Sequence, residues 1–248
     1  MIVAEIATTA RDRFGLPRGY RAQERGQTHD ASRQSGDTYW AEWRLANNRR
    51  YQRHVYAWAA ELIQDHGLRS VLDVGCGPGV KIREMIASRC EDITGVDQPS
   101  ALAQARVHVP RATLVEADLE RPGLWLGRRF DLVICADVVE HMVDPDPLMR
   151  VLLEHAGGLV LISTPERERE RGRGCLESSK PEHVREWSHA EFAWFLGSRG
   201  LCVLEHRLLP KDDAPVAPLL SAEAAFAMGR ADRSPLCCQA ALCRAALG

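Results

Sequence analysis

The order of the sequence elements predicts an α/β fold, with a doubly wound, mostly parallel sheet and helices on both faces. Residues 71–79 read Val-Leu-Asp-Val-Gly-Cys-Gly-Pro-Gly, a short apolar strand followed by a loop with three glycines. Further along the chain, apolar stretches rich in β-branched residues alternate with helical patterns. This alternation is typical of βαβ units, which assemble into parallel sheets covered by helices.

Length and composition fit one such domain with additions. The chain has 248 residues, of which 45% are hydrophobic and 27% charged, and its net charge of −2 argues against a general nucleic-acid binder. No apolar run is long enough to span a bilayer, and the order of charges near the N-terminus is the reverse of a secretion signal. We therefore expect a cytoplasmic protein with no membrane role.

The eight cysteines are expected to be reduced and to act as small apolar residues. They contain no C-x-x-C pair, the spacing with which many zinc sites begin. A metal that helps to deprotonate a diol is conceivable chemistry, but the sequence shows no cluster of ligands that we would name. We therefore predict no metal site.

Two segments precede the sheet. Residues 1–37 are rich in arginine and lack a sustained period, which predicts an irregular arm. Residues 38–66 predict an amphipathic helix that ends near His66 and Gly67. The aromatic residues at its start either pack the helix on the sheet or form a lid over a ligand. We favour a lid that contacts the substrate, made of Tyr39, Trp40 and Trp43.

The main domain is expected to span residues 67–248. Five strands are predicted at residues 68–74, 92–97, 112–116, 130–136 and 159–163. Helices are predicted at residues 79–89, 101–107 and 148–156. We expect Ser100 to cap the second helix, Asp146 and Pro147 to open the third, and Gly157-Gly158 to end it.

An insertion, residues 165–187, follows the fifth strand. It begins with alternating glutamates and arginines at residues 166–171, which we interpret as a solvated surface because the charges cancel. Ser188 and Glu191 predict a capping box for a helix at residues 190–198. The remaining elements are predicted as a strand at residues 201–209, a short helix from Ser221 and a strand at residues 236–244.

Acidic residues follow the predicted strands, at Asp73, Asp97, Asp118 and Asp137. Ligands bind outside the carboxyl ends of the strands in an open parallel sheet, so we expect these residues to form one site. Asp97 lies 22 positions after Gly75, where a carboxylate can accept hydrogen bonds from the two ribose hydroxyls of an adenosine. NAD-dependent enzymes share this arrangement.

The pattern Asp73-x-Gly75-x-Gly77-x-Gly79 resembles the first motif of class I methyltransferases, which use S-adenosylmethionine (SAM) and release S-adenosylhomocysteine. The resemblance implies a seven-stranded sheet with one antiparallel strand. It also implies that the glycine loop lies against the methionine part of SAM, that Asp97 and Gln98 hold the ribose, and that Asp118 accepts from the adenine amino group. The full set of cofactor-binding residues that it implies is Asp73, Gly75, Cys76, Gly77, Gly79, Asp97, Gln98, Asp118, Leu119, Ala136, Asp137 and Val138.

Two histidines are the candidate catalytic residues. The stretch at residues 135–145 resembles the segment after the fourth strand of small-molecule methyltransferases, in which His141 is the candidate base. Alternatively, His141 is structural and orientation alone drives the reaction. The run at residues 163–167, followed by His-Val-Arg-Glu-Trp at residues 183–187, resembles bacterial methyltransferases of sugars, surface glycans and other secondary metabolites. There, His183 and Arg185 either hold a polar acceptor or pin the insertion to the domain.

These motifs favour a SAM-dependent methyltransferase that acts on an oxygen or nitrogen of a small polar metabolite. A methyltransferase for RNA or protein is disfavoured by the net acidity and by the lack of an Asn-Pro-Pro-Tyr-like clamp. A non-catalytic SAM-binding protein is a further alternative. An NAD-dependent oxidoreductase is the least favoured, because the third glycine does not have the dinucleotide spacing. A homodimer is left open.

Overall fold

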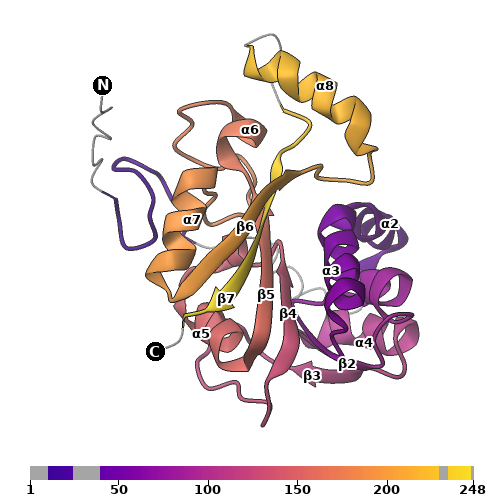
Figure 1. Ribbon diagram of the computed structural model, residues 1–248. Helices are drawn as coiled ribbons and strands as arrows, with labels where there is room; N and C mark the ends of the chain where they lie inside the picture. Colours follow the sequence, from indigo (N-terminus) through magenta and orange to yellow (C-terminus); the bar gives the residue numbers. More distant parts are fainter. Residues whose placement is uncertain (1–10, 25–39, 229–233, 247–248) are drawn as a thin grey trace.

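A seven-stranded sheet forms the centre of the structure, a computed structural model that describes residues 11–24, 40–228 and 234–246 (Figure 1). The strands lie in the order β3-β2-β1-β4-β5-β7-β6. Their bounds are β1 Ser70–Val74, β2 Asp92–Asp97, β3 Thr113–Glu116, β4 Phe130–Ala136, β5 Ala156–Pro165, β6 Leu201–Leu209 and β7 Cys238–Ala245. Strands β1 to β5 pair in parallel, and β7 is antiparallel to β5 and β6. The predicted sheet is confirmed, including its antiparallel strand.

Helices cover both faces of the sheet. One core lies against α3, η2 and α4, and the other lies against α5 and α7 (Figure 1). The helical elements are α2 Glu42–Arg50, α3 Arg53–His66, π-helix η2 Ile82–Ile86, α4 Pro99–His108, 3-10 turn η3 Val139–His141, α5 Asp146–His155, α6 Arg167–Arg171, α7 His189–Ser198 and α8 Val216–Ala227. In the described parts of the chain, no helix has both the length and the apolar character needed to cross a membrane.

The alternating side chains of the inner strands build these two cores. In β4, Val133 and Cys135 belong to the core beside α5 and α7, whereas Leu132 and Ile134 belong to the core beside α3 and α4. All four side chains are fully buried. A strand buried on both faces reads as a continuous apolar run, which is why the sequence predicts its position well.

The single helix predicted at residues 38–66 is wrong, because the chain forms two helices there. The break lies at Tyr51 and Gln52, where Gln52 has a φ of +58°. The Gln52 side chain donates to an Asp137 carboxylate oxygen at 2.9 Å, so a long-range contact accompanies the break. The predicted end is confirmed: α3 ends at His66, and Gly67 adopts a φ of +61°.

Two predicted helix boundaries are also wrong. Gln98, and not Ser100, precedes the first turn of α4, because Pro99 occupies the first helical position, where its missing N–H is not needed. Gly157 and Gly158 do not end a helix but lie inside β5. A Cβ atom on Gly158 would lie 2.7 Å from the Asp131 carbonyl oxygen of β4, so the close strand pairing requires a glycine.

The solvated surface predicted for residues 166–171 is wrong as well. Residues 167–171 form α6 and Glu166 caps it, and Glu166 and Arg167 are buried with 3% and 2% exposure. Two nitrogens of the Arg167 guanidinium donate to the two carboxylate oxygens of Glu191 at 2.6 and 2.8 Å. The predicted capping box of Ser188 and Glu191 is confirmed.

The last elements lie close to their predicted positions. Strand β6 has the predicted bounds, and β7 is shifted by two residues at its start. Helix α8 begins at Val216 and not at Ser221. Pro218 lies within its first turn, where a missing N–H breaks no hydrogen bond of the helix.

Candidate active site

A pocket with a volume of about 200 Å³ lies at the carboxyl ends of β1, β2, β3 and β4. Each strand end contributes residues to its wall, as expected for a doubly wound sheet. The wall consists of Trp40, Gly75, Asp97, Gln98, Ser100, Ala101, Ala117, Leu119, Glu120, Asp137, Val138, His141 and Met142. Eight of the predicted site residues, including Trp40 and His141, are therefore brought together here.

The glycine loop is shaped by its backbone. Gly75, Gly77 and Gly79 have φ angles of +78°, +58° and +74°, a region that other residues rarely adopt. A Cβ atom on Gly75 would lie 2.4 Å from a methyl carbon of Val138. The loop thus packs directly against the segment that follows β4, and only glycine permits this approach.

Asp97 fixes the loop to the end of β2. Its two carboxylate oxygens accept hydrogen bonds from the backbone N–H groups of Gly77 and Gln98, each at 2.7 Å. Burial raises the pKa of Asp97, and these hydrogen bonds oppose the effect. A carboxylate can accept about four hydrogen bonds, so two lone pairs remain for a ligand in the pocket.

Asp73 is fully buried at the end of β1, with one oxygen unsatisfied. The Tyr56 hydroxyl donates to its Oδ2 at 2.8 Å, whereas its Oδ1 has no hydrogen-bond partner. Burial raises the pKa of Asp73 to about 7. The neighbouring Lys81 is also buried, which lowers its pKa to about 8, and its ammonium donates to the backbone and side-chain oxygens of Asn48.

Several predicted cofactor residues do not line the pocket. The Asp118 carboxylate accepts from the Glu120 backbone N–H and pairs with Arg121 at 3.3 Å, so its contact with adenine stays a prediction. The Cys76 side chain is buried and packs against Gly95. Gly77, Gly79 and Ala136 support the pocket from outside its wall.

Asp137 has an unusual backbone conformation and a fully bonded side chain. Its φ is +54°, and with Gln52 it makes up the pair of non-glycine residues with positive φ in the described ranges. Ser163 donates to one of its carboxylate oxygens at 2.7 Å, and Gln52 donates to the other. Strained backbone of this kind persists only where neighbouring contacts hold it, and it is common at functional sites.

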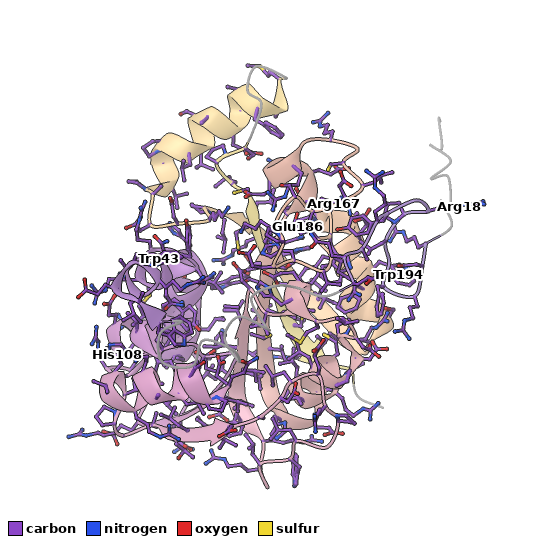
Figure 2. All side chains as sticks on the ribbon, turned by 180° about the vertical axis from the view of Figure 1, so that it is seen from behind. Arg18, Trp43, His108, Arg167, Glu186 and Trp194 are labelled. Atoms are coloured by element: carbon purple, nitrogen blue, oxygen red, sulfur yellow. The ribbon has the colours of Figure 1, made fainter. Side chains whose placement is uncertain are left out.

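The structure places one residue of the predicted aromatic lid at the pocket and another away from it. Trp40 lines the pocket, as predicted. Trp43 does not: it lies on α2 with 59% of its surface exposed, and Figure 2 shows it at the periphery of the molecule. Tyr39 lies outside the described residues. Trp40 is therefore the one residue of the proposed lid that the structure places at the site.

Glu140, His141 and His183 come together beside the pocket, with one ligand atom from each lying within 4.8 Å of the others. His141 Nδ1 lies 2.6 Å from the Glu182 carbonyl oxygen, and His183 Nδ1 lies 2.5 Å from a Glu186 carboxylate oxygen. These oxygens only accept, so each neutral ring carries its proton on Nδ1. The sequence indicates no such cluster, because 41 positions separate Glu182 from His141, with a predicted helix, a predicted strand and most of the insertion between them.

Burial sets the charge of this cluster. It lowers the pKa of His141 to about 3, so the ring is neutral across the physiological range. Burial also raises the pKa of Glu140 well above its usual value. A nitrogen with so low a pKa is a poor proton acceptor, which weakens the prediction that His141 acts as a general base.

Arg185 is used for structure, which argues against its predicted contact with the acceptor. Its terminal nitrogens donate to the carbonyl oxygens of Met142 and Val143 at 2.8 and 2.7 Å. The guanidinium also stacks 4.1 Å from the Phe14 ring centre, and the side chain is 3% exposed. The alternative interpretation holds for this residue: it pins the insertion to the segment after β4.

Glu186 anchors the interior of the insertion. It accepts hydrogen bonds from Arg171, Ser178 and His183. Burial opposes ionisation of Glu186, but the hydrogen bonds from His183 and Arg171 outweigh it and lower its pKa to about 2. Figure 2 shows Glu186 and Arg167 together, well away from Trp43. A network of buried charges therefore fixes His183.

A comparison with protein families identifies the family of the chain. The model of a family described as "Methyltransferase domain" matches residues 27–206, which include every strand from β1 to β5. The chain belongs to the methyltransferase domain family. The sequence-based assignment to SAM-dependent methyltransferases is thereby confirmed, and SAM is the cofactor of this methyltransferase.

Curated relatives of this methyltransferase include the ubiquinone biosynthesis O-methyltransferase of Pseudomonas paraeruginosa, which is 36% identical over 106 residues. The match covers 40% of the chain and 45% of that relative. The corresponding protein of Bordetella avium is 34% identical over 117 residues, with 44% of the chain and 48% of the relative covered. The chain thus matches less than half the length of these relatives.

Solved structures share the fold. The N-methyltransferase NodS of Bradyrhizobium japonicum, in complex with S-adenosylhomocysteine, superimposes with a TM-score of 0.56 at 14% identity, covering 88% of this chain and 98% of that one. A SAM-dependent methyltransferase of Clostridium acetobutylicum gives the same TM-score and identity, covering 79% of this chain and 92% of that one. At this identity, the similarity concerns the fold alone.

The residues present fit SAM. The pocket combines a carboxylate with free lone pairs, Asp97, with an apolar wall that includes Ala101, Leu119 and Met142, as an adenosine requires. The unsatisfied oxygen of Asp73 needs a hydrogen-bond donor, and the amino group of SAM is one.

Proposed function

We propose that this methyltransferase transfers the methyl group of SAM to an oxygen atom of a small, hydroxylated, polar molecule. One observation carries the proposal: a single small pocket joins the adenosine-binding strand ends to Asp137, Val138 and His141, beside the Glu140–His183 cluster. The curated relatives are named O-methyltransferases, which supports oxygen over nitrogen as the acceptor atom.

SAM supplies a methyl group on a positively charged sulfur, which is a good electrophile. The residues of the chain position the cofactor and the acceptor relative to each other. Asp97 and Gln98, which line the pocket, would hold the ribose, Leu119 would pack on the adenine, and the glycine loop would accept the methionine part. Because methyl transfer depends on in-line orientation, a fixed wall is more important than a strong base.

The wall segment after β4 has this rigidity. Asp137 is bonded through both carboxylate oxygens, and Arg185 clamps the carbonyl groups of Met142 and Val143. Trp40 lines the pocket, and its indole ring would help to exclude water from a bound acceptor. These contacts would hold the acceptor against the methyl group in one orientation.

An RNA or protein acceptor fits less well. The pocket wall, as far as the described residues form it, contains no lysine or arginine for a phosphate backbone, and its volume suits a small molecule. A non-catalytic SAM-binding protein is the alternative of a different class. It would bind the cofactor as tightly and transfer no methyl group.

Replacement of Asp97 tests the pocket. Asp97→Asn keeps the shape of the side chain but removes the charge and one acceptor, so we expect the affinity for S-adenosylhomocysteine to fall about 10- to 100-fold. Calorimetry measures it. Asp92→Asn, at the opposite end of the same strand, is the matched control and should bind within twofold of the wild type. Equal affinity of the two variants would contradict the placement of the cofactor.

Turnover with labelled SAM tests the reaction. We expect methyl transfer to members of a panel of small catechols, phenols and sugars, and little transfer to amines or RNA. Binding of S-adenosylhomocysteine without transfer to any acceptor would favour the non-catalytic alternative.

A further inference from the structure

We propose that Glu140, His141 and His183 bind a divalent transition-metal ion at the wall of the pocket. Two imidazole rings and one carboxylate place their ligand atoms within 4.8 Å of one another, which is the spread expected of three ligands around one ion. His141 itself lines the pocket, so an ion held here would be accessible to a small molecule bound in it.

The hydrogen bonds of the two rings are those of metal-ligating histidines. A histidine that binds a metal usually donates its other ring N–H to a carbonyl or carboxylate oxygen, which fixes the tautomer and the direction of the ring. His141 Nδ1 donates to the Glu182 carbonyl at 2.6 Å, and His183 Nδ1 donates to Glu186 at 2.5 Å. Both Nε2 atoms are left with an unprotonated lone pair.

The carboxylate supplies an independent observation. Glu140 is fully buried, and its Oε2 accepts a hydrogen bond from the Thr164 hydroxyl at 3.1 Å. Its Oε1 is buried without a hydrogen-bond partner. A buried acceptor without a partner is destabilising, and a cation would satisfy it.

The cluster is held in place from two elements. Glu140 and His141 lie on η3, and His183 comes from the insertion. The backbone N–H groups of Val184 and Arg185 donate to the Glu140 carbonyl at 2.8 and 3.3 Å, which ties the two segments together beside the ligands. The ligands are therefore preorganised, as selective metal sites require.

The donor set indicates the kind of ion. Imidazole nitrogens suit manganese, iron, cobalt, nickel and zinc, whereas magnesium and calcium prefer oxygen ligands. Three protein ligands leave coordination positions for water or substrate, as in catalytic and not structural sites. We therefore expect a divalent first-row transition ion and weak binding of Mg²⁺.

The role of the ion rests on the proposed function and names its substrate class: acceptors with a hydroxyl, or two adjacent ones, that can reach the ion. Bound to the acceptor oxygen, a divalent ion lowers the pKa of the hydroxyl, whose proton passes to water. The oxygen then attacks the methyl carbon, the O–C bond forms as the S–C bond breaks, and the electron pair of that bond stays on sulfur. No basic side chain is required for this step.

Direct metal titration tests the site without any turnover. We would strip the full chain with a chelator and titrate it with Co²⁺ and Mn²⁺, with calorimetry and the visible spectrum of bound Co²⁺ as readouts. We expect one equivalent to bind, and at least a 100-fold weaker affinity in His141→Asn, His183→Asn and Glu140→Gln. His206→Asn is the matched control: His206 also has a neighbouring histidine, His189, on which its ring stacks, but it lies outside this cluster, and the variant should bind as the wild type does.

The affinity for S-adenosylhomocysteine and the thermal melt of every variant show whether it folds. Metal binding that the three substitutions abolish in folded protein supports the site, even if no methyl transfer is found. The site is overturned if stripped wild-type protein binds no ion, or if folded ligand variants bind it as tightly as His206→Asn. Full methyl transfer by the stripped protein in excess chelator would overturn the catalytic role while leaving the proposed function intact.

Discussion

The glycine loop and the insertion of residues 165–187 flank the same site but are built on different principles. The loop owes its shape to three residues with positive φ, at 75, 77 and 79, so its fold is contained in a few neighbouring positions. The insertion owes its shape to charged side chains that meet across long stretches of chain, such as Arg167 with Glu191 and Arg171 with Glu186. The shape of the loop therefore depends on neighbouring residues, whereas the shape of the insertion depends on contacts between residues that are far apart in the sequence.

This difference explains why the sequence reveals one region and conceals the other. A glycine at a strand end has few structural meanings, whereas a run of alternating charges has the same composition on a solvated surface and in a buried network. The cancelling charges of residues 166–171 favoured the solvated interpretation, but each buried charge here has its partner elsewhere in the chain. The three predictions below test the contrast, from the largest effect to the smallest.

Arg167→Met should destabilise the protein the most. The substitution leaves Glu191 as an uncompensated charge in a largely buried position, which typically costs about 3–5 kcal/mol of the free energy of unfolding. Urea denaturation, monitored by circular dichroism, measures this loss of stability. Arg173→Met, at an exposed arginine of the same insertion, is the control and should change stability by less than about 0.5 kcal/mol. A loss below about 1 kcal/mol in Arg167→Met would mean that the ion pair is solvated after all.

Gly75→Ala should have a somewhat smaller effect. The new Cβ atom would overlap Val138 at 2.4 Å, and the residue would keep a φ of +78°, which together cost about 2–4 kcal/mol. Gly67→Ala isolates the backbone part, because its φ is +61° and no atom lies near the added Cβ, so it should cost about 1 kcal/mol. In the Gly75→Ala, Val138→Ala double variant, only the backbone part should remain. Equal losses in Gly75→Ala and Gly67→Ala would refute the packing argument.

Removal of the aromatic side chains should change cofactor affinity and leave stability almost unaltered. Trp40→Ala removes part of the pocket wall and should weaken S-adenosylhomocysteine binding about 5- to 10-fold, which is near 1 kcal/mol. Trp43→Ala removes a side chain that is 59% exposed and should bind within twofold of the wild type. Calorimetry on both variants decides the comparison. A larger loss in Trp43→Ala would restore the lid that the sequence predicts.

The fold was predictable because its signals are short-range. Strand β2 has its predicted bounds, since Asp92–Asp97 is an apolar run that opens with one carboxylate and ends with another. The break between α2 and α3 was not predictable, because it coincides with the bond between Gln52 and Asp137, 85 positions apart. The same holds for the metal-ligand cluster and for Arg185, whose partners are carbonyl groups that carry no sequence signature.

Strand β7 has a consequence for the order in which the sheet is completed. It is the last strand in the sequence but lies between β5 and β6, and β6 has no other partner in the sheet. During synthesis, β5 therefore presents an open edge to the surroundings until residues 238–245 leave the ribosome. Nascent chains that stall before that point would expose the open edge of β5 and the unpaired strand β6 to chaperones or to one another.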